Sequence, residues 1–110
     1  MKTLRELNAY FLGAGGPGVL LRDPVTGNLT EAPKRDGVGV EFECPCGCES
    51  PVYIPFRNPL DGGPAYESGN HPTWERTGET LEDLTLSPSI LRLSGCKWHG
   101  YIRQGRAEPC

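Results

Sequence analysis

The chain has 110 residues, a length typical of a single domain, and a formal net charge of −3 at pH 7. Its 15 glycines and 11 prolines favour short strands and loops over a helical bundle. Acidic and basic residues are interleaved, which argues against nucleic acid as a partner. No run of about 18 apolar residues predicts a membrane span, and Arg5 and Glu6 interrupt any signal-peptide pattern. We therefore expect a cytoplasmic protein with reduced thiols.

The N-terminal residues predict a short helix. Thr3 and Glu6 have the spacing of a capping box, and apolar residues recur at helical spacing as far as Leu12. Residues 13–18 then match the letters of a dinucleotide-binding G-x-G-x-x-G pattern. That pattern requires a helix opening within it. Here Pro17 interrupts and a strand follows, so we interpret the segment as a connector.

Alternation of apolar and polar residues predicts a mostly β protein, a small α+β fold once the helix is counted. Three hairpins are predicted, each from two segments: 18–22 with 29–32, 38–42 with 52–56, and 90–93 with 101–103. The second and third carry the Cys and His residues at their tips, an arrangement like that of zinc ribbons or Rieske domains. Residues 57–71 show no periodicity, and loops of this length tend to be functional or disordered. We expect an N-terminal extension over 1–37 and a metal-binding β region over 38–110, within one compact domain.

The two predicted hairpin tips together supply the ligands of one metal site. The first tip has the pattern C-x-C-x-C, at Cys44, Cys46 and Cys48, and the second has C-x-x-H, at Cys96 and His99. Zinc takes four such ligands in tetrahedral geometry. A Cys₃His site needs only two of the three clustered thiols, and the spacing does not choose between them. We predict zinc, with a [2Fe–2S] cluster as the alternative.

The sequence does not predict an enzyme. Four protein ligands close the coordination of a structural zinc, whereas a catalytic zinc keeps one position open. Glu43, Glu49 and His71 are candidate general bases, but we interpret them as solvated side chains. The segment Ser87-Pro88-Ser89 is interpreted as a turn, because the sequence places no histidine beside either serine. Enzymatic activity is therefore left open.

Aromatic and basic side chains accompany the second tip. Trp98 and Tyr101 are expected to pack over the metal site, as large aromatic side chains do in a small core. Cys110, the last residue, is expected to be a free thiol. Four basic residues are interpreted as a solvated strand face: Arg92, Lys97, Arg103 and Arg106.

Several motifs occur together in one order: F-x-C-P-C-G-C at 42–48, Trp74, T-L-S-P-S-I at 85–90, and C-x-x-H-G-Y-I-x-x-G at 96–105. In this the chain resembles a family of small phage- and prophage-encoded proteins of unknown function that are often labelled "ammonia monooxygenase". Related domains occur beside bacterial ubiquitin-like conjugation genes. The chain has neither a membrane span nor a recognisable copper site, so we do not expect the labelled activity.

The resemblance implies a metal-stabilised accessory protein of phage type in the cytoplasm of the bacterial host. Such a protein would act through contacts with a host or phage protein, in host–phage conflict or protein modification. The alternative is a metal-dependent enzyme or a [2Fe–2S] redox protein that uses the same Cys/His site.

Overall fold

The longest strand, β5 (Arg35–Glu43), runs along the middle of the molecule and pairs antiparallel with strands on both sides. The computed structural model describes residues 2–48, 50–65, 72–91 and 98–109. β5 lies between β2 (Tyr10–Ala14) and β6 (Pro51–Pro55) in a three-stranded sheet. Val38, Val40 and Phe42 of β5 are buried because successive side chains of a strand point to opposite faces. The predicted hairpin with the cysteines at its tip is confirmed.

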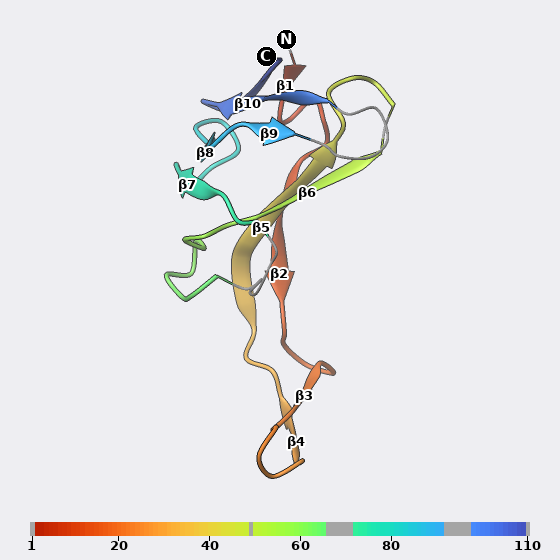
Figure 1. Cartoon of the computed structure of the whole chain (residues 1–110), viewed down its shortest axis with the longest axis vertical. Helices are drawn as coiled ribbons and strands as arrows, with labels where there is room; N and C mark the ends of the chain where they lie inside the picture. Colours follow the sequence, from red (N-terminus) through yellow and green to blue (C-terminus); the bar gives the residue numbers. More distant parts are fainter. Residues whose placement is uncertain (1, 49, 66–71, 92–97, 110) are drawn as a thin grey trace.

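A second, four-stranded sheet lies at the end of the molecule that carries both termini (Figure 1). Its strands, in spatial order, are β1 (Lys2–Thr3), β11 (Arg106–Pro109), β10 (His99–Arg103) and β9 (Ile90–Leu91). Strands β7 (Glu75–Thr77) and β8 (Thr85–Ser87) form an antiparallel pair beside it. The antiparallel pairing of β9 with β10 confirms the strands of the third predicted hairpin.

One hydrophobic core joins these sheets. It includes Leu4 from the N-terminal turn, Phe42 from β5, Ile102 from β10 and Phe56, which follows β6. The rings of Phe11 and Phe56 meet edge to face with their centroids 6.2 Å apart, an arrangement that aromatic pairs prefer. The protein is therefore mostly β, as predicted.

The predicted N-terminal helix is wrong. The capping contacts do form, because the Thr3 and Glu6 backbone N–H groups each donate to the other residue's side chain. They close a single turn, which ends at Asn8 with a φ of 53°. From Tyr10 the chain instead pairs with β5 and buries apolar side chains against it. The described residues contain no helix long and apolar enough to cross a membrane.

The first part of the predicted long loop is fastened to β5. Two hydrogen bonds of 2.9 Å run from the Arg35 guanidinium to the Asp61 carboxylate, which also accepts from the Gly63 N–H. Because these bonds favour the charged carboxylate, they lower the pKa of Asp61 to about 2. The Leu60 N–H donates to the Gly37 carbonyl at 2.9 Å. Residues 66–71 of this loop lie outside the described residues.

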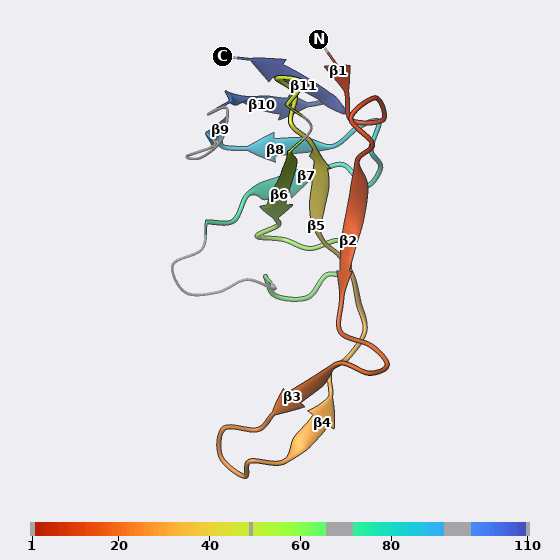
Figure 2. The same ribbon diagram turned by 90° about the vertical axis from the view of Figure 1, so that its right-hand side faces the viewer.

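A two-stranded arm projects from the opposite end of the molecule (Figure 2). It comprises residues 15–34 and contains β3 (Leu20–Arg22) and β4 (Leu29–Glu31), which confirms the first predicted hairpin. In the described part of the chain, these two strands make strand-to-strand contacts only with each other. Five of its large apolar side chains are exposed: Val19, Leu20, Leu21, Val25 and Leu29. The arm gives the molecule its length, 50 Å against 27 and 22 Å across.

Candidate functional site

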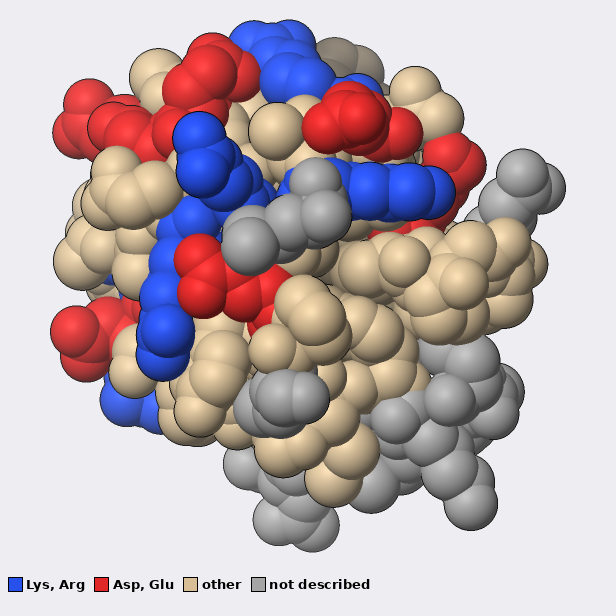
Figure 3. Space-filling view, turned by 90° about the horizontal axis from the view of Figure 1, so that it is seen from above, with Lys and Arg blue, Asp and Glu red and all other residues tan. Residues whose placement is uncertain are grey.

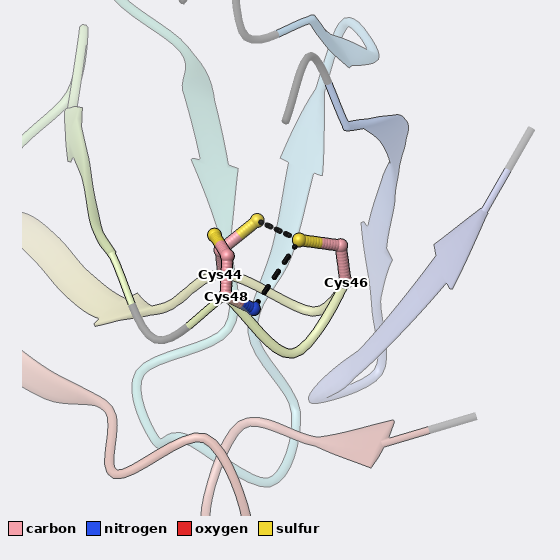
Figure 4. Close-up of side chains that lie close together, drawn as sticks. All are labelled: Cys44, Cys46 and Cys48. Carbon is pink, nitrogen blue, oxygen red and sulfur yellow. Dashed lines mark hydrogen bonds between the residues drawn. The ribbon is translucent and has the colours of Figure 1, made fainter. Parts of the chain in front are cut away.

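Three thiols converge at the tip of the β5–β6 hairpin (Figure 4). The Sγ atoms of Cys44, Cys46 and Cys48 all lie within 4.8 Å of one another. The turn is closed by hydrogen bonds from the Cys44 N–H to the Ser50 carbonyl and from the Gly47 N–H to the Cys44 carbonyl. Gly47 has a φ of 94°, in the left-handed region that glycine adopts at low cost. The turn thus folds all three side chains to one side.

This cluster fits a metal ion. Zinc bound at about 2.3 Å from each sulfur in tetrahedral geometry separates the sulfurs by about 3.8 Å. The Sγ atoms of Cys44 and Cys46 are 3.4 Å apart, and the Cys48 N–H donates to the Cys46 Sγ at 3.4 Å. Such N–H donors stabilise thiolate ligands. Cys44 is 1% exposed, and a thiolate ligand buried to this degree would need a partner of opposite charge. A cation would supply it.

The thiol cluster lies near Trp98, the residue that precedes His99 and β10. Cys44 and Trp98 belong to the same hydrophobic core. A hollow of about 530 Å³ lies between the two segments, and its lining consists of Lys2, Pro45, Cys46, Trp98, Ala107 and Pro109. The first tip therefore lies across this hollow from Trp98, which precedes β10. Cys96 lies outside the described residues.

His99 faces a different partner. Its Nε2 atom lies 3.2 Å from the Oγ of Ser89, a hydrogen-bonding distance. Among the described residues, the group of ligand atoms within 4.8 Å of one another consists of the three cysteines and does not include His99. The prediction that His99 binds the metal remains a prediction. We call the new contact the Ser89–His99 pair.

Strand pairing and a tryptophan hold the Ser89–His99 pair in place. His99 lies opposite Leu91 in the β9–β10 ladder, and Ser89 immediately precedes β9. The indole N–H of Trp74 donates to the Ser89 carbonyl at 3.3 Å. Trp74 is itself fixed by a backbone hydrogen bond of 3.0 Å from its N–H to the Pro55 carbonyl. Ser89 is half-buried and His99 is exposed.

A serine hydroxyl hydrogen-bonded to an imidazole nitrogen is the arrangement of an activated nucleophile. The histidine accepts the hydroxyl proton as the oxygen attacks a carbonyl carbon. In the described part of the chain, no carboxylate hydrogen-bonds to the other ring nitrogen of His99. The pair is therefore described as a dyad.

The other predicted site residues have separate surroundings. The Glu43 carboxylate accepts a hydrogen bond from the Asn8 side chain. Trp98 is buried in the core that contains Cys44, while Tyr101 is half-buried beneath Arg103. Besides Cys96, five interpreted residues lie outside the described part of the chain: Glu49, His71, Arg92, Lys97 and Cys110.

Comparison with known proteins bears on both parts of the site. A protein-family profile matches residues 22–110, and its description is "bacterial ubiquitination-like system serine protease (BubE)". The chain belongs to the BubE family. The matched region contains the thiol cluster, Ser89 and His99. The expected link to bacterial ubiquitin-like systems is thereby confirmed at the level of the family. No curated protein and no solved structure matches the chain.

Sequence reasoning missed the Ser89–His99 pair. It considered Ser87-Pro88-Ser89 and rejected both serines, because no histidine is placed beside them by local spacing. The available signal was the third predicted hairpin, which pairs residues 90–91 with residues 99–100 and so brings Ser89 near His99. That hairpin was predicted, but His99 had been assigned to the metal through the C-x-x-H pattern.

Proposed function

We propose that this protein is a serine-type peptidase acting on protein substrates in a bacterial ubiquitination-like system. Ser89 serves as the nucleophile and His99 as the general base. The observation that carries the proposal is the 3.2 Å contact between the Ser89 Oγ and the His99 Nε2. The description of the BubE family as serine proteases supports the same assignment.

The proposed reaction proceeds in two halves. The Ser89 Oγ attacks the carbonyl carbon of a peptide or isopeptide bond while Nε2 of His99 takes the hydroxyl proton. His99 then protonates the leaving amine, and the carbon–nitrogen bond breaks to leave an ester on Ser89. Nε2 of His99 then takes a proton from a water molecule, whose oxygen attacks the ester carbon. The bond between that carbon and Oγ breaks, the acid product leaves, and His99 returns the proton to Oγ. Apart from water, no oxidant, reductant or second substrate is required.

The metal has a structural role in this proposal. Cys44, Cys46 and Cys48 would hold zinc with a fourth ligand from the second tip, either Cys96 or His99. The bound ion would balance the thiolate charge and fasten the β5–β6 tip to the start of β10. An imidazole that binds metal through one nitrogen carries its proton on the other. A ligand role for His99 therefore competes with its role as general base, and we propose Cys96 as the fourth ligand.

Labelling with a fluorophosphonate probe tests the nucleophile without knowledge of the substrate. Such probes react covalently with activated serines. Wild-type protein should be labelled, Ser89→Ala should not, and His99→Ala should be labelled at least about 100-fold more slowly, given typical general-base contributions. Ser87→Ala is the matched control and should be labelled like wild type, because Ser87 lies two residues away in the same motif. Labelling that survives Ser89→Ala would overturn the proposal.

Metal content decides between Cys96 and His99 as the fourth ligand. We expect one zinc per chain in wild type and in His99→Ala, and loss of zinc in Cys96→Ser. Loss of zinc from both variants would instead favour the sequence prediction, in which Cys96 and His99 both bind the metal. Loss from His99→Ala alone would assign the fourth position to His99. Iron and visible absorption in the purified protein would favour the [2Fe–2S] alternative. The role in host–phage conflict and the cytoplasmic location stay predictions of the sequence resemblance.

A further inference from the structure

The outer face of β10 presents three side chains in a row that begins at His99. Along this strand His99, Tyr101 and Arg103 alternate with the buried residues Gly100 and Ile102. At about 3.3 Å per residue, Tyr101 follows His99 by about 7 Å and Arg103 by about 13 Å. Any extended peptide that places its scissile bond at the Ser89–His99 pair and runs along β10 passes over this row.

Arg103 extends back along the row toward His99. Its guanidinium carbon lies 3.9 Å from the centre of the Tyr101 ring, so that the charged group covers the tyrosine. Stacking of this kind fixes the orientation of a guanidinium and leaves its in-plane N–H donors directed outward. The guanidinium therefore lies over Tyr101, two residues from His99, although Arg103 itself is four residues from His99.

The salt bridge between Arg103 and Glu108 leaves most N–H donors of the guanidinium without a carboxylate partner among the described residues. Its single contact with Glu108 is 3.4 Å long, and the Arg103 side chain is 52% exposed. The other arginines in salt bridges make two-pronged contacts with their carboxylates, at 2.6 and 3.2 Å for Arg5 with Glu82 and at 2.9 Å twice for Arg35 with Asp61. The same chain thus contains well-formed structural arginine pairs, from which Arg103 differs.

A second arginine strengthens the positive charge. Arg106 lies directly opposite Arg103 in the β10–β11 ladder, and like charges in that position destabilise a hairpin. Within the described residues, Arg106 has no salt bridge. Figure 3 views this end of the molecule from above and shows Lys and Arg side chains between groups of Asp and Glu. The two cations therefore lie together at the far end of the row that begins at His99, where an anionic group could balance their charge.

We infer that Arg103, supported by Arg106, is a specificity-determining residue that binds a carboxylate side chain of the substrate. The inference rests on the proposed peptidase function. The position of the guanidinium over Tyr101 places the substrate's Asp or Glu two to four residues from the scissile bond. Arginine suits this ligand because its planar donors match the two oxygens of a carboxylate.

A randomised mixture of synthetic peptides tests the inference, with cleavage sites identified by mass spectrometry. Wild type should enrich Asp and Glu at one position within four residues of the scissile bond. Arg103→Gln should lower that enrichment by about tenfold or more, the size expected for a hydrogen bond to a charged group. Arg103→Glu should replace it with enrichment of Lys and Arg at the same position. A purely structural role for Arg103 would not reverse the preference.

Arg22→Glu on the arm is the matched control, because it makes the same charge change at the opposite end of the molecule. It should leave the peptide profile unchanged. Cleavage that depends on Ser89 but shows no acidic preference, or a preference that Arg103→Glu does not alter, would overturn this inference and leave the peptidase function standing. The absence of any Ser89-dependent cleavage would overturn both. Thermal unfolding of each variant shows that the altered protein is folded.

Discussion

Gly100 lies in β10 directly after His99, and its replacement by alanine tests how closely β10, β11 and Trp98 pack. A Cβ atom at this position would overlap the carbonyl oxygen of Glu108 and lie 2.5 Å from the Cζ2 atom of the Trp98 ring. Ordinary contacts begin at 3.4 Å, so each neighbour would have to move by about 1 Å. One neighbour is the backbone of the paired strand β11, which cannot move alone.

The expected cost lies at the upper end of the range for overpacked cores, about 3 kcal/mol. For a domain of this size that loss lowers the melting temperature by roughly 10 °C or more. Because His99 is the adjacent residue, a displacement of β10 by about 1 Å should also slow fluorophosphonate labelling of Ser89 by about 100-fold. Both quantities can be measured on the same preparation, by thermal unfolding and by the rate of labelling.

Gly13→Ala provides the control for Gly100→Ala. Gly13 also lies in a paired strand, but the nearest atom to its added Cβ would be the Arg35 carbonyl oxygen at 3.1 Å. We expect a loss below about 1 kcal/mol and unchanged labelling. If Gly100→Ala melted and reacted like wild type, the close approach of β10, β11 and Trp98 would be wrong. The position of His99 that follows from it would then also be in doubt.

Three further predictions concern the metal, the acid response and the arm. Removal of metal by a chelator, checked by elemental analysis, should unfold the β5–β6 tip and lower the melting temperature sharply, because structural zinc contributes on the order of 10 kcal/mol. An unchanged melting curve would refute the structural role of the metal. The pKa of Asp61 is about 2 in the folded chain and higher when unfolded, so its contribution to stability is present above about pH 4 and is lost as the pH falls toward 2. Urea unfolding over that interval should accordingly show a weaker pH dependence for Asp61→Asn than for wild type, and equal slopes would contradict the assignment. Replacement of residues 15–34 by Asn-Gly would join the paired residues Ala14 and Arg35. Labelling of Ser89 should stay within about twofold of wild type, because β3 and β4 contact no other described strand. Lost labelling would show that the arm supports the site.

The sequence predicted those parts of the fold in which local pattern and tertiary contact agree. Alternation in residues 38–42 and 52–56 identified β5 and β6, since both strands bury one face. Strands β1 and β11 were missed, because Lys2–Thr3 is too short to show a period and Arg106–Pro109 is largely polar. These strands form by pairing: β11 pairs with β10, and β1 pairs with β11.

The predicted N-terminal helix was wrong because tertiary contacts decide the structure of this segment. Leu4 and Leu7 have helical spacing, but a single turn places both side chains in the core equally well. The thiol cluster was predictable because its three cysteines are close in sequence. The Ser89–His99 pair was not, because ten positions separate the two residues and the register of β9 against β10 decides whether they meet. The C-x-x-H pattern indicates a metal ligand at His99 and gives no indication of a serine partner.

The arm leaves the rest of the protein at two neighbouring points, since Ala14 and Arg35 face each other across β2 and β5. An insertion whose ends lie side by side can be lengthened, exchanged or lost without altering the path of the chain on either side. Strands β9 and β10, which hold the Ser89–His99 pair in place, lie at the opposite end of the molecule, beyond the full length of β5. A binding surface engineered into the arm would therefore lie far from this pair.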